Sequence, residues 1–324
     1  MTFTQQLQQT LGAHWTEFTV FFQRALESDI VLLDTINRYL LQHTGKQLRP
    51  LLTLLTAGMH GNVNDSSYLA ASAVEMIHTS SLLHDDVIDN ADERRGAPSV
   101  KAVWRSNASV LAGDYWLARI FQLVISREEH SLLPWFANCL VDLSEGELLQ
   151  LEKSRTLDTT EADYFKIIGK KTASLIAVSM ATGALTAGAA DDTVQRMYDA
   201  GYEIGIAFQI RDDLFDYHKT NLFGKPTGND LREQKLTLPL LYALSQADEK
   251  QRAQVLQWVK DAAKNTRRNS DIVRFVEDMD GFKYAEKALL SHTERAEDIL
   301  RTFPVNVFRD KLMELARYLI MRKK

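Results

Sequence analysis

Apolar residues recur along the chain at the spacing of amphipathic helices. Leu32, Leu33, Ile36, Tyr39 and Leu40 share one helical face, because residues three or four positions apart lie on the same side of an α-helix. A second set of this kind, opened by Pro304, follows near the C-terminus: Val307, Phe308, Leu312, Leu315 and Leu319. Both patterns predict surface helices that bury one side against a core.

A different pattern lies between residues 172 and 190, where no charged residue occurs. The stretch is long enough to cross a bilayer by length alone. It is rich in Ala, Ser, Thr and Gly, however, and small side chains let neighbouring helices approach closely. We therefore expect a buried central helix rather than a membrane span.

Glycine and proline are scarce: the chain has 15 Gly and 6 Pro among 324 residues, against an average combined usage of about 12%. Folds made of many short strands need frequent turns, which use these residues. Scarcity therefore favours few turns and long helices. A chain of this length suggests about two domains, but no Ser/Gly/Pro-rich linker separates two parts. We predict one all-α domain spanning residues 1–324.

Charge and cysteine content narrow the class of protein. Lys and Arg number 38 against 43 Asp and Glu, which gives a net charge of −5. The chain lacks the basic excess typical of nucleic-acid binding. Its single cysteine, Cys139, allows no internal disulfide and suits a reducing compartment. The N-terminal residues lack the basic and apolar regions of a signal peptide, so we expect a cytoplasmic protein.

Two acidic motifs, LLHDDVID and QIRDDLFD, share the same spacing of three aspartates. With 100° between successive helical residues, the three carboxylates of each motif project within about one turn. Like charges this close destabilise a helix, so helix stability does not account for them. The motifs contain Asp85, Asp86 and Asp89, and Asp212, Asp213 and Asp216.

Such clusters are typical of divalent metal sites. Mg²⁺ prefers oxygen ligands, keeps several waters, and binds through a few carboxylates plus substrate phosphates. Two clusters could hold several Mg²⁺ ions with a diphosphate between them. The alternatives are a solvated acidic face and a structural Ca²⁺-binding module.

Basic residues accompany the acidic motifs. Lys and Arg bind the oxygens of polyphosphates, which favours a diphosphate ligand. His78 lies two helical turns before Asp85, on nearly the same face, and could reach an anion. The basic candidates are Lys46, Arg49, Arg94, Arg95, Lys171, Lys225 and Lys235. No nucleotide-binding glycine loop, CxxC pair or nucleophile elbow competes with this interpretation.

Taken together, these motifs resemble the trans-polyprenyl diphosphate synthases, which include octaprenyl, heptaprenyl and geranylgeranyl diphosphate synthases. The resemblance runs from GKQLRP through EMIHTSSLLHDDVIDNADERRG, NASVLAGDYWLARIF, SEGELLQL, KTASL and FQIRDDLFDY to GKPTGNDLREQKLTLPLL. Two departures occur where the family commonly has glycine: Thr44 stands in the pair before Lys46, and Gln234 stands before Lys235.

The resemblance implies an all-α bundle around a deep central cavity, as a homodimer. It also implies condensation of isopentenyl diphosphate with an allylic diphosphate, such as geranyl or farnesyl diphosphate, to a product able to partition into membranes. It implies two to three Mg²⁺ ions bound by the six aspartates, with Asp85, Asp89 and Asp212 as principal ligands.

The residues implied for isopentenyl diphosphate are Lys46, Arg49, His78 and Arg95. Those implied for the allylic diphosphate are Arg94, Lys171, Lys225 and Lys235. Thr172 and Gln209 would face the developing carbocation, which makes Lys171, Thr172 and Gln209 the catalytic candidates.

Product length is a separate prediction. The resemblance implies that the growing chain runs down the central cavity, here called the shaft, alongside the helix that carries Asp85. Ser81 and Ser80 would lie about 6 and 7.5 Å below Asp85 along that helix. Two small serines there leave the shaft open, which predicts a product of about 25 to 40 carbons. Met76, Ile77, Trp116 or Phe121 could still close the shaft. Ser80→Phe is expected to shorten the product.

Three other functions compete with this one. One is a short-chain synthase of the same family, whose closed shaft would limit the product to about 15 to 20 carbons. A terpene cyclase usually has a different second metal motif and lacks the isopentenyl site. A non-catalytic modulatory subunit tends to have lost acidic motifs, whereas both are intact here.

Overall fold

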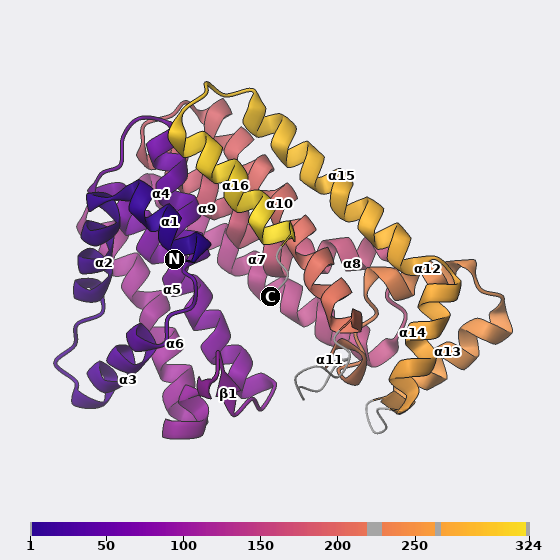
Figure 1. Ribbon diagram of the computed structural model, residues 1–324. Helices are drawn as coiled ribbons and strands as arrows, with labels where there is room; N and C mark the ends of the chain where they lie inside the picture. The colour runs from indigo at the N-terminus through magenta and orange to yellow at the C-terminus, as the bar shows by residue number, and fades with distance from the viewer. Residues whose placement is uncertain (1, 219–228, 263–266, 322–324) are drawn as a thin grey trace. The chain divides into compact units, whose positions relative to one another are not determined.

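The computed structural model describes residues 2–218, 229–262 and 267–321. In these ranges the chain folds into α-helices, with one two-stranded hairpin between α5 and α6 (Figure 1). The all-α prediction is therefore confirmed. Two compact units can be distinguished, with boundaries inside α7, α10 and α16. Whether the whole chain behaves as one domain stays a prediction.

The first unit contains residues 1–140, 175–198 and 303–315. Its elements are α1 (Phe3–Leu11), α2 (Ala13–Ala25), α3 (Val31–Gln42), α4 (Leu48–Met59), α5 (Asp65–Ile88), β1 (Glu93–Arg94), β2 (Ala97–Pro98), α6 (Val100–Ser126), η1 (His130–Leu132), α9 (Ser174–Thr186), and parts of α7 (Leu133–Thr156), α10 (Asp191–His218) and α16 (Val307–Met321).

The second unit contains residues 141–174, 199–302 and 316–324. Besides the remaining parts of α7, α10 and α16, its elements are α8 (Glu161–Ile168), η2 (Gly169–Ala173), α11 (Asn229–Arg232), α12 (Leu238–Gln246), α13 (Glu249–Ala262), α14 (Arg267–Asp278) and α15 (Gly281–Arg301).

The uncharged segment near residue 180 forms α9, and its side chains are buried from Ser174 to Ala184. Small residues permit this burial: a Cβ added to Gly183 would lie 2.3 Å from the backbone oxygen of Thr53 in α4. The expectation of a central buried helix is confirmed.

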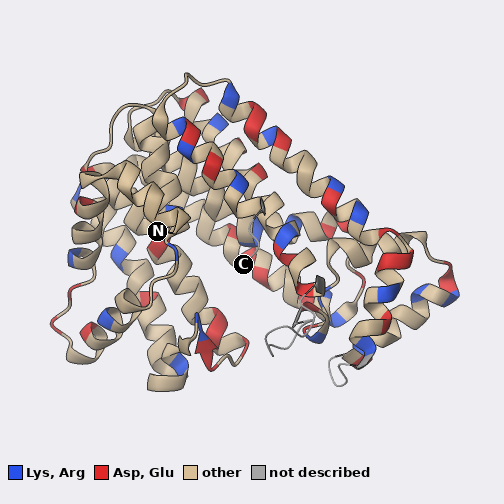
Figure 2. Ribbon diagram, in the orientation of Figure 1, with Lys and Arg blue, Asp and Glu red and all other residues tan. Residues whose placement is uncertain are grey.

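The two amphipathic helices predicted from their apolar spacing are α3 and α16. Ile36, Leu312, Leu315 and Leu319 are buried as expected, whereas Leu32 and Val307 are exposed. α15 shows the same division of faces: acidic and basic residues follow one another along it (Figure 2), while Ala285, Leu289 and Leu300 are buried.

The helix that carries the first acidic motif, α5, is held on several sides. Its N-terminus is capped by Asn64, whose side chain accepts the backbone N–H of Ser67 at 3.0 Å. Residues 67–77 are all buried, and α5 packs against α2, α4 and α6. Ser109 of α6 donates to the backbone oxygen of Leu83 at 2.9 Å. This packing fixes the direction in which α5 presents its acidic end.

The following helix, α6, is unusual in its surface. Among the described helices it alone is long and apolar enough to cross a membrane by length and composition. Only 33% of its most apolar window is buried. Val110, Leu111 and Ile125 are exposed on it and fall within about 100° of one another on the helical wheel. α6 therefore carries an apolar face that the described residues of the first unit leave exposed.

Candidate functional site

The first acidic motif is divided by the fold. Asp86 is 2% exposed and its Oδ1 accepts hydrogen bonds from Arg94, at 2.8 Å from Nε and 2.6 Å from the terminal nitrogen. Asp85 is half-buried and Asp89 is exposed, four residues apart on the same helical face. Asp86 thus binds a protein cation, whereas Asp85 and Asp89 form the outward-facing pair.

The position of this motif argues for a ligand. Asp85 and Asp86 lie in the last turn of α5, and Asp89 caps its C-terminus. The C-terminal end of a helix carries a partial negative charge, which disfavours carboxylates there. A site selected for stability would avoid this arrangement. Acidic and basic residues gather at this end of α5 and the adjoining hairpin (Figure 2).

The hairpin after α5 determines the direction of the Arg95 side chain. Residues Glu93 and Arg94 pair with Ala97 and Pro98, and the turn residues Arg95 and Gly96 have φ of 57° and 79°. A two-residue turn of this kind matches the twist of the strands, but the left-handed region is costly for a residue other than glycine. Arg95 therefore occupies a strained position that places its side chain.

Three neighbours hold the Arg95 guanidinium. It donates to the backbone oxygen of His43 at 3.3 Å, and another of its nitrogens lies 3.5 Å from Nε2 of His78. It also packs on Gly45, where an added Cβ would lie 2.8 Å from Cζ. A side chain at this position of the GKQLRP motif would therefore displace the Arg95 guanidinium.

Arg49 and His78 complete this cationic group. Burial lowers the pKa of Arg49 to about 10, so the guanidinium stays charged near neutrality. Burial and then the neighbouring arginines hold the pKa of His78 well below its usual range, so its imidazole is neutral. Lys46 is exposed in the loop before α4, three residues from Arg49. The structure therefore brings together Arg49, His78 and Arg95, as the sequence predicts.

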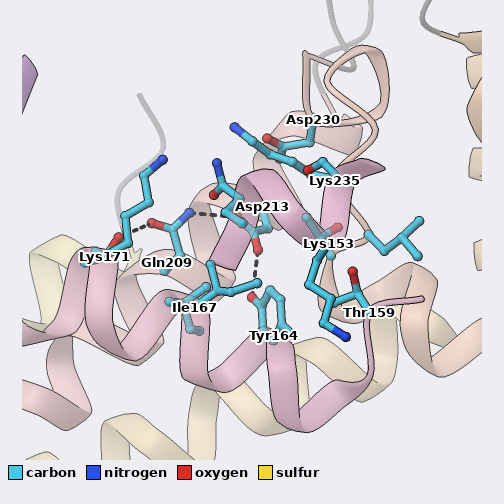
Figure 3. Close-up of a pocket in the computed structure, with 15 residues that line it drawn as sticks. Lys153, Thr159, Tyr164, Ile167, Lys171, Gln209, Asp213, Asp230 and Lys235 are labelled. Atoms are coloured by element: carbon cyan, nitrogen blue, oxygen red, sulfur yellow. Dashed lines mark hydrogen bonds between the residues drawn. The ribbon is translucent and has the colours of Figure 1, made fainter. Parts of the chain in front are cut away.

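The second acidic motif lies on α10, in the second unit, and is divided in the same way. Asp213 is 4% exposed; its Oδ2 accepts from the hydroxyl of Tyr164 at 2.7 Å and its Oδ1 from Nε2 of Gln209 at 2.8 Å (Figure 3). Asp212 is exposed, and Oδ2 of Asp216 accepts from the backbone N–H of Asp230 at 3.0 Å.

The hydrogen bonds continue to the catalytic candidates. The hydroxyl of Thr172 donates to Oε1 of Gln209 at 2.8 Å, so the Gln209 amide is held at both ends. Thr172 and Lys171 lie in η2, a single π-helical turn. Such turns inside helical segments occur frequently at functional sites.

Two lysines at this site already have acidic partners. Lys171 pairs with Glu147 of α7, and Lys235 pairs with Glu233. A Cβ on Gly146 would lie 2.9 Å from the backbone nitrogen of Lys171, which explains glycine beside Glu147. Lys225 lies outside the described residues.

These groups surround one pocket (Figure 3). Five predicted site residues line it together with Tyr164, Asp230 and Lys153: Lys171, Thr172, Gln209, Asp213 and Lys235. They come from three separate segments of the chain, and the fold gathers them into one wall.

Sequence reasoning missed several residues of the two sites. Tyr164 and Asp213 are far apart in the chain, so their contact leaves no local pattern. Asp230 stands inside the GKPTGND motif, where an acidic residue beside predicted phosphate ligands was a usable signal. Gln234 has φ of 58°, which explains why the family commonly has glycine at this position.

Ser80 and Ser81 occupy different faces of α5. Ser81 is half-buried, shares the face of Asp85, and its hydroxyl donates to the backbone oxygen of His78 at 2.9 Å. Ser80 is 0% exposed, and no described residue hydrogen-bonds its hydroxyl. The shaft predicted beneath Asp85 therefore concerns Ser81 more directly than Ser80.

The protein side chains alone supply only part of the ligands that a Mg²⁺ ion needs. Within residues 2–218, 229–262 and 267–321, no group of three or more His, Cys, Asp or Glu side chains is arranged to hold a metal ion. The reason is visible in both motifs, since Asp86 and Asp213 bond to protein groups. Two carboxylates completed by waters and substrate phosphates still match the usual Mg²⁺ site.

Comparison with known proteins places the chain in context. The family model described as Polyprenyl synthetase matches residues 30–277. The octaprenyl diphosphate synthase of Haemophilus influenzae is 35% identical over 292 residues, covering 90% of this chain and 88% of that protein.

Two solved structures are similar over almost the whole chain. A decaprenyl diphosphate synthase from Rhodobacter capsulatus has a TM-score of 0.91 and 34% identity, with 99% of both chains covered. A polyprenyl synthase from Caulobacter crescentus, complexed with calcium and isoprenyl diphosphate, has a TM-score of 0.89 and 32% identity, with 99% of this chain and 98% of that one covered.

The acidity of Asp230 gives a test of this geometry. Burial and then the charge of Asp216 raise the pKa of Asp230 from 3.8 to about 6. The folded state therefore keeps this proton to a higher pH than the unfolded state. Stability from this group is present below about pH 4 and is lost as pH rises towards 6, at a cost of about 3 kcal/mol at pH 7.

We expect Asp230→Asn, in chelator-containing buffer, to unfold at higher denaturant than the parent protein at pH 7, with the difference vanishing near pH 4. Glu286→Gln, which removes an exposed carboxylate of α15, serves as control and should leave the pH dependence unchanged. An Asp230→Asn protein less stable than the parent at pH 7 would contradict the assignment.

Proposed function

The chain belongs to the polyprenyl synthetase family of trans-prenyl diphosphate synthases, and we propose that it is a Mg²⁺-dependent enzyme that extends an allylic diphosphate with isopentenyl diphosphate to a medium- or long-chain all-trans product. The observation that carries the proposal is the shared pocket of Lys171, Thr172, Gln209, Asp213 and Lys235. These residues combine cations for a diphosphate with oriented oxygens for a developing carbocation.

The reaction needs no protein nucleophile. The bond between the allylic carbon and its diphosphate breaks, the double bond of isopentenyl diphosphate attacks that carbon, and a proton leaves, with the released diphosphate as its acceptor. When bound, Mg²⁺ supplies positive charge that neutralises the departing diphosphate. In the first unit the outer aspartates Asp85 and Asp89 would hold it, and in the second unit Asp212 would hold it, with Asp216 alongside.

The protein's own groups stabilise the charges that develop. Lys171, Lys235 and Arg94 each have an acidic partner in the structure, so their cationic heads are held in place before substrate arrives. Preorganised charges of this kind need little reorganisation during reaction. Gln209, held by Asp213 and Thr172, presents a fixed amide dipole.

We assign isopentenyl diphosphate to the group formed by Lys46, Arg49, His78 and Arg95. Neutral His78 can accept from Arg95 or donate to a phosphate oxygen, and it adds no competing charge. The similar polyprenyl synthase from Caulobacter crescentus is complexed with calcium and isoprenyl diphosphate, which supports a diphosphate and a divalent cation for this family. The modulatory-subunit alternative is disfavoured because both acidic motifs retain outward-facing aspartates.

Replacing an outer aspartate tests the assignment. We expect Asp85→Ala and Asp212→Ala each to abolish turnover of isopentenyl and farnesyl diphosphate without changing the circular dichroism spectrum. The control is Asp34→Asn, which removes a carboxylate paired with Arg38 on α3 and should leave activity unchanged. Near-normal turnover of either alanine variant at saturating Mg²⁺ would refute the proposed function.

Product length is tested on α5. Relatives named octaprenyl and decaprenyl diphosphate synthase support a long product, and small Ser81 on the Asp85 face leaves room for it. We expect Ser81→Phe to shorten the product, measured by chromatography of labelled chains. Ser80→Phe, placed in packed core, should mainly lower stability. An unchanged product distribution for folded Ser81→Phe would count against this path.

The apolar face of α6 supports a homodimer, because exposed apolar surface of this kind is typical of protein interfaces. We expect sedimentation equilibrium to give twice the chain mass of 36.8 kDa. Leu111, 67% exposed, is the probe: Leu111→Glu should produce monomers, whereas Leu32→Glu on α3 should not. A monomeric parent protein, or one that sediments only with membranes, would contradict this interface.

A further inference from the structure

A carboxylate is buried beneath the proposed isopentenyl site. Glu75 lies on α5, one turn before His78, and is 2% exposed. It lines the same pocket as Arg94, Arg95 and Thr79. Glu75 opens the EMIHTSSLLHDDVIDNADERRG motif, but no role follows for it from the sequence, and the proposed reaction does not use it. A buried carboxylate is retained only when nearby charge or hydrogen bonds compensate it.

The compensating charges are Arg49 and Arg95. Each guanidinium is stabilised in its charged form by Glu75, and the charge of Arg95 opposes that of Arg49. Burial raises the pKa of Glu75 above its usual value, and the charges of Arg49 and Arg95 offset only part of that rise. The neighbouring carboxylate Asp86 bonds to Arg94. Glu75 is thus the counter-charge shared by two mutually repelling cations, the partly buried Arg49 and the exposed Arg95.

Glu75 acts without occupying the arginine donors. Its Oε2 and the Nε of Arg49 are both shielded from solvent, and neither has a hydrogen-bond partner among the described residues. A locked bidentate pair would have used up those N–H groups. Compensation through space instead leaves the N–H groups of Arg49 unused by Glu75.

We propose that Glu75 is a positioning residue for isopentenyl diphosphate: its carboxylate holds Arg49 and Arg95 together as a paired cation that receives the diphosphate. This rests on the proposed function, because the ligand of the arginines is assigned there. Without the carboxylate, the repulsion between the two cations is no longer offset, and the guanidinium of exposed Arg95 is expected to move away from Arg49.

Steady-state kinetics with each substrate varied in turn separate this role from a general loss of stability. We expect Glu75→Gln to raise KM for isopentenyl diphosphate by about tenfold or more, the size of one lost charge-assisted contact. KM for farnesyl diphosphate should stay within about twofold, since additivity errors are of that order. Glu75→Asp, which keeps the charge, should recover part of the loss.

The matched control is Glu203→Gln. Glu203 is a partly buried carboxylate of the second unit, paired with His292 and Arg295, and its removal should leave both KM values unchanged. A double-mutant cycle tests whether Glu75 acts through Arg95. Adding Glu75→Gln to Arg95→Gln should change KM for isopentenyl diphosphate by less than about twofold, because the cation that Glu75 positions is already absent.

Several results would overturn the proposal. These are an unchanged KM for isopentenyl diphosphate in Glu75→Gln, equal increases in both KM values, or multiplicative effects in the cycle. If Glu75→Gln alone does not fold, the double variant with Arg95→Gln replaces it, because removing one charge of each sign is expected to leave the protein folded. If the double variant also fails to fold, the role of Glu75 is purely structural and the proposal is overturned. Absence of turnover by the parent protein would overturn the proposed function as well, whereas turnover with unchanged Glu75→Gln kinetics would overturn this inference alone.

Discussion

A carboxylate taken into a helical core must find a cation or hydrogen-bond donors, and this constraint organises both acidic motifs. The middle aspartate of each motif is buried and bonded to the protein, Asp86 to Arg94 and Asp213 to Tyr164 and Gln209. Breaking such a buried interaction typically costs about 3–5 kcal/mol for an ion pair. The middle residue is therefore fixed, and it sets the direction in which the outer aspartates face.

The same logic extends to the cations. Arg94, Lys171 and Lys235 are each paired with an aspartate or glutamate of their own unit. These partners fix the positions of cations that the proposed function assigns to substrate phosphates. Glu75 does this for Arg49 and Arg95.

Much of this architecture could be predicted from local pattern. The scarcity of glycine and proline and the spacing of apolar residues indicated long helices, and small uncharged residues indicated a buried α9. Two of the few glycines have a local structural reason: Gly45 lies against the Arg95 guanidinium, and Gly96 has a positive φ in the hairpin turn. Helical periodicity also placed Arg49 and His78 on the correct elements.

Contacts between distant segments could not be predicted in this way. The helical wheel put three carboxylates on one side of α5, but it contained no information about Arg94 folding back onto Asp86. Tyr164, Asp230 and Glu75 acquire their roles only from partners on other elements. Ser80 and Ser81 are adjacent in sequence, yet packing against neighbouring helices buries one completely.

The central claim is that only the outer aspartates of each motif bind metal. The most direct measurement is a crystal structure of this chain with Mg²⁺ and inorganic diphosphate. The account predicts Mg²⁺–oxygen distances of about 2.0–2.1 Å to Asp85, Asp89 or Asp212, with the Asp86–Arg94 and Asp213–Tyr164 bonds intact. A Mg²⁺ ion coordinated directly by Asp86 or Asp213, with those bonds broken, would contradict it.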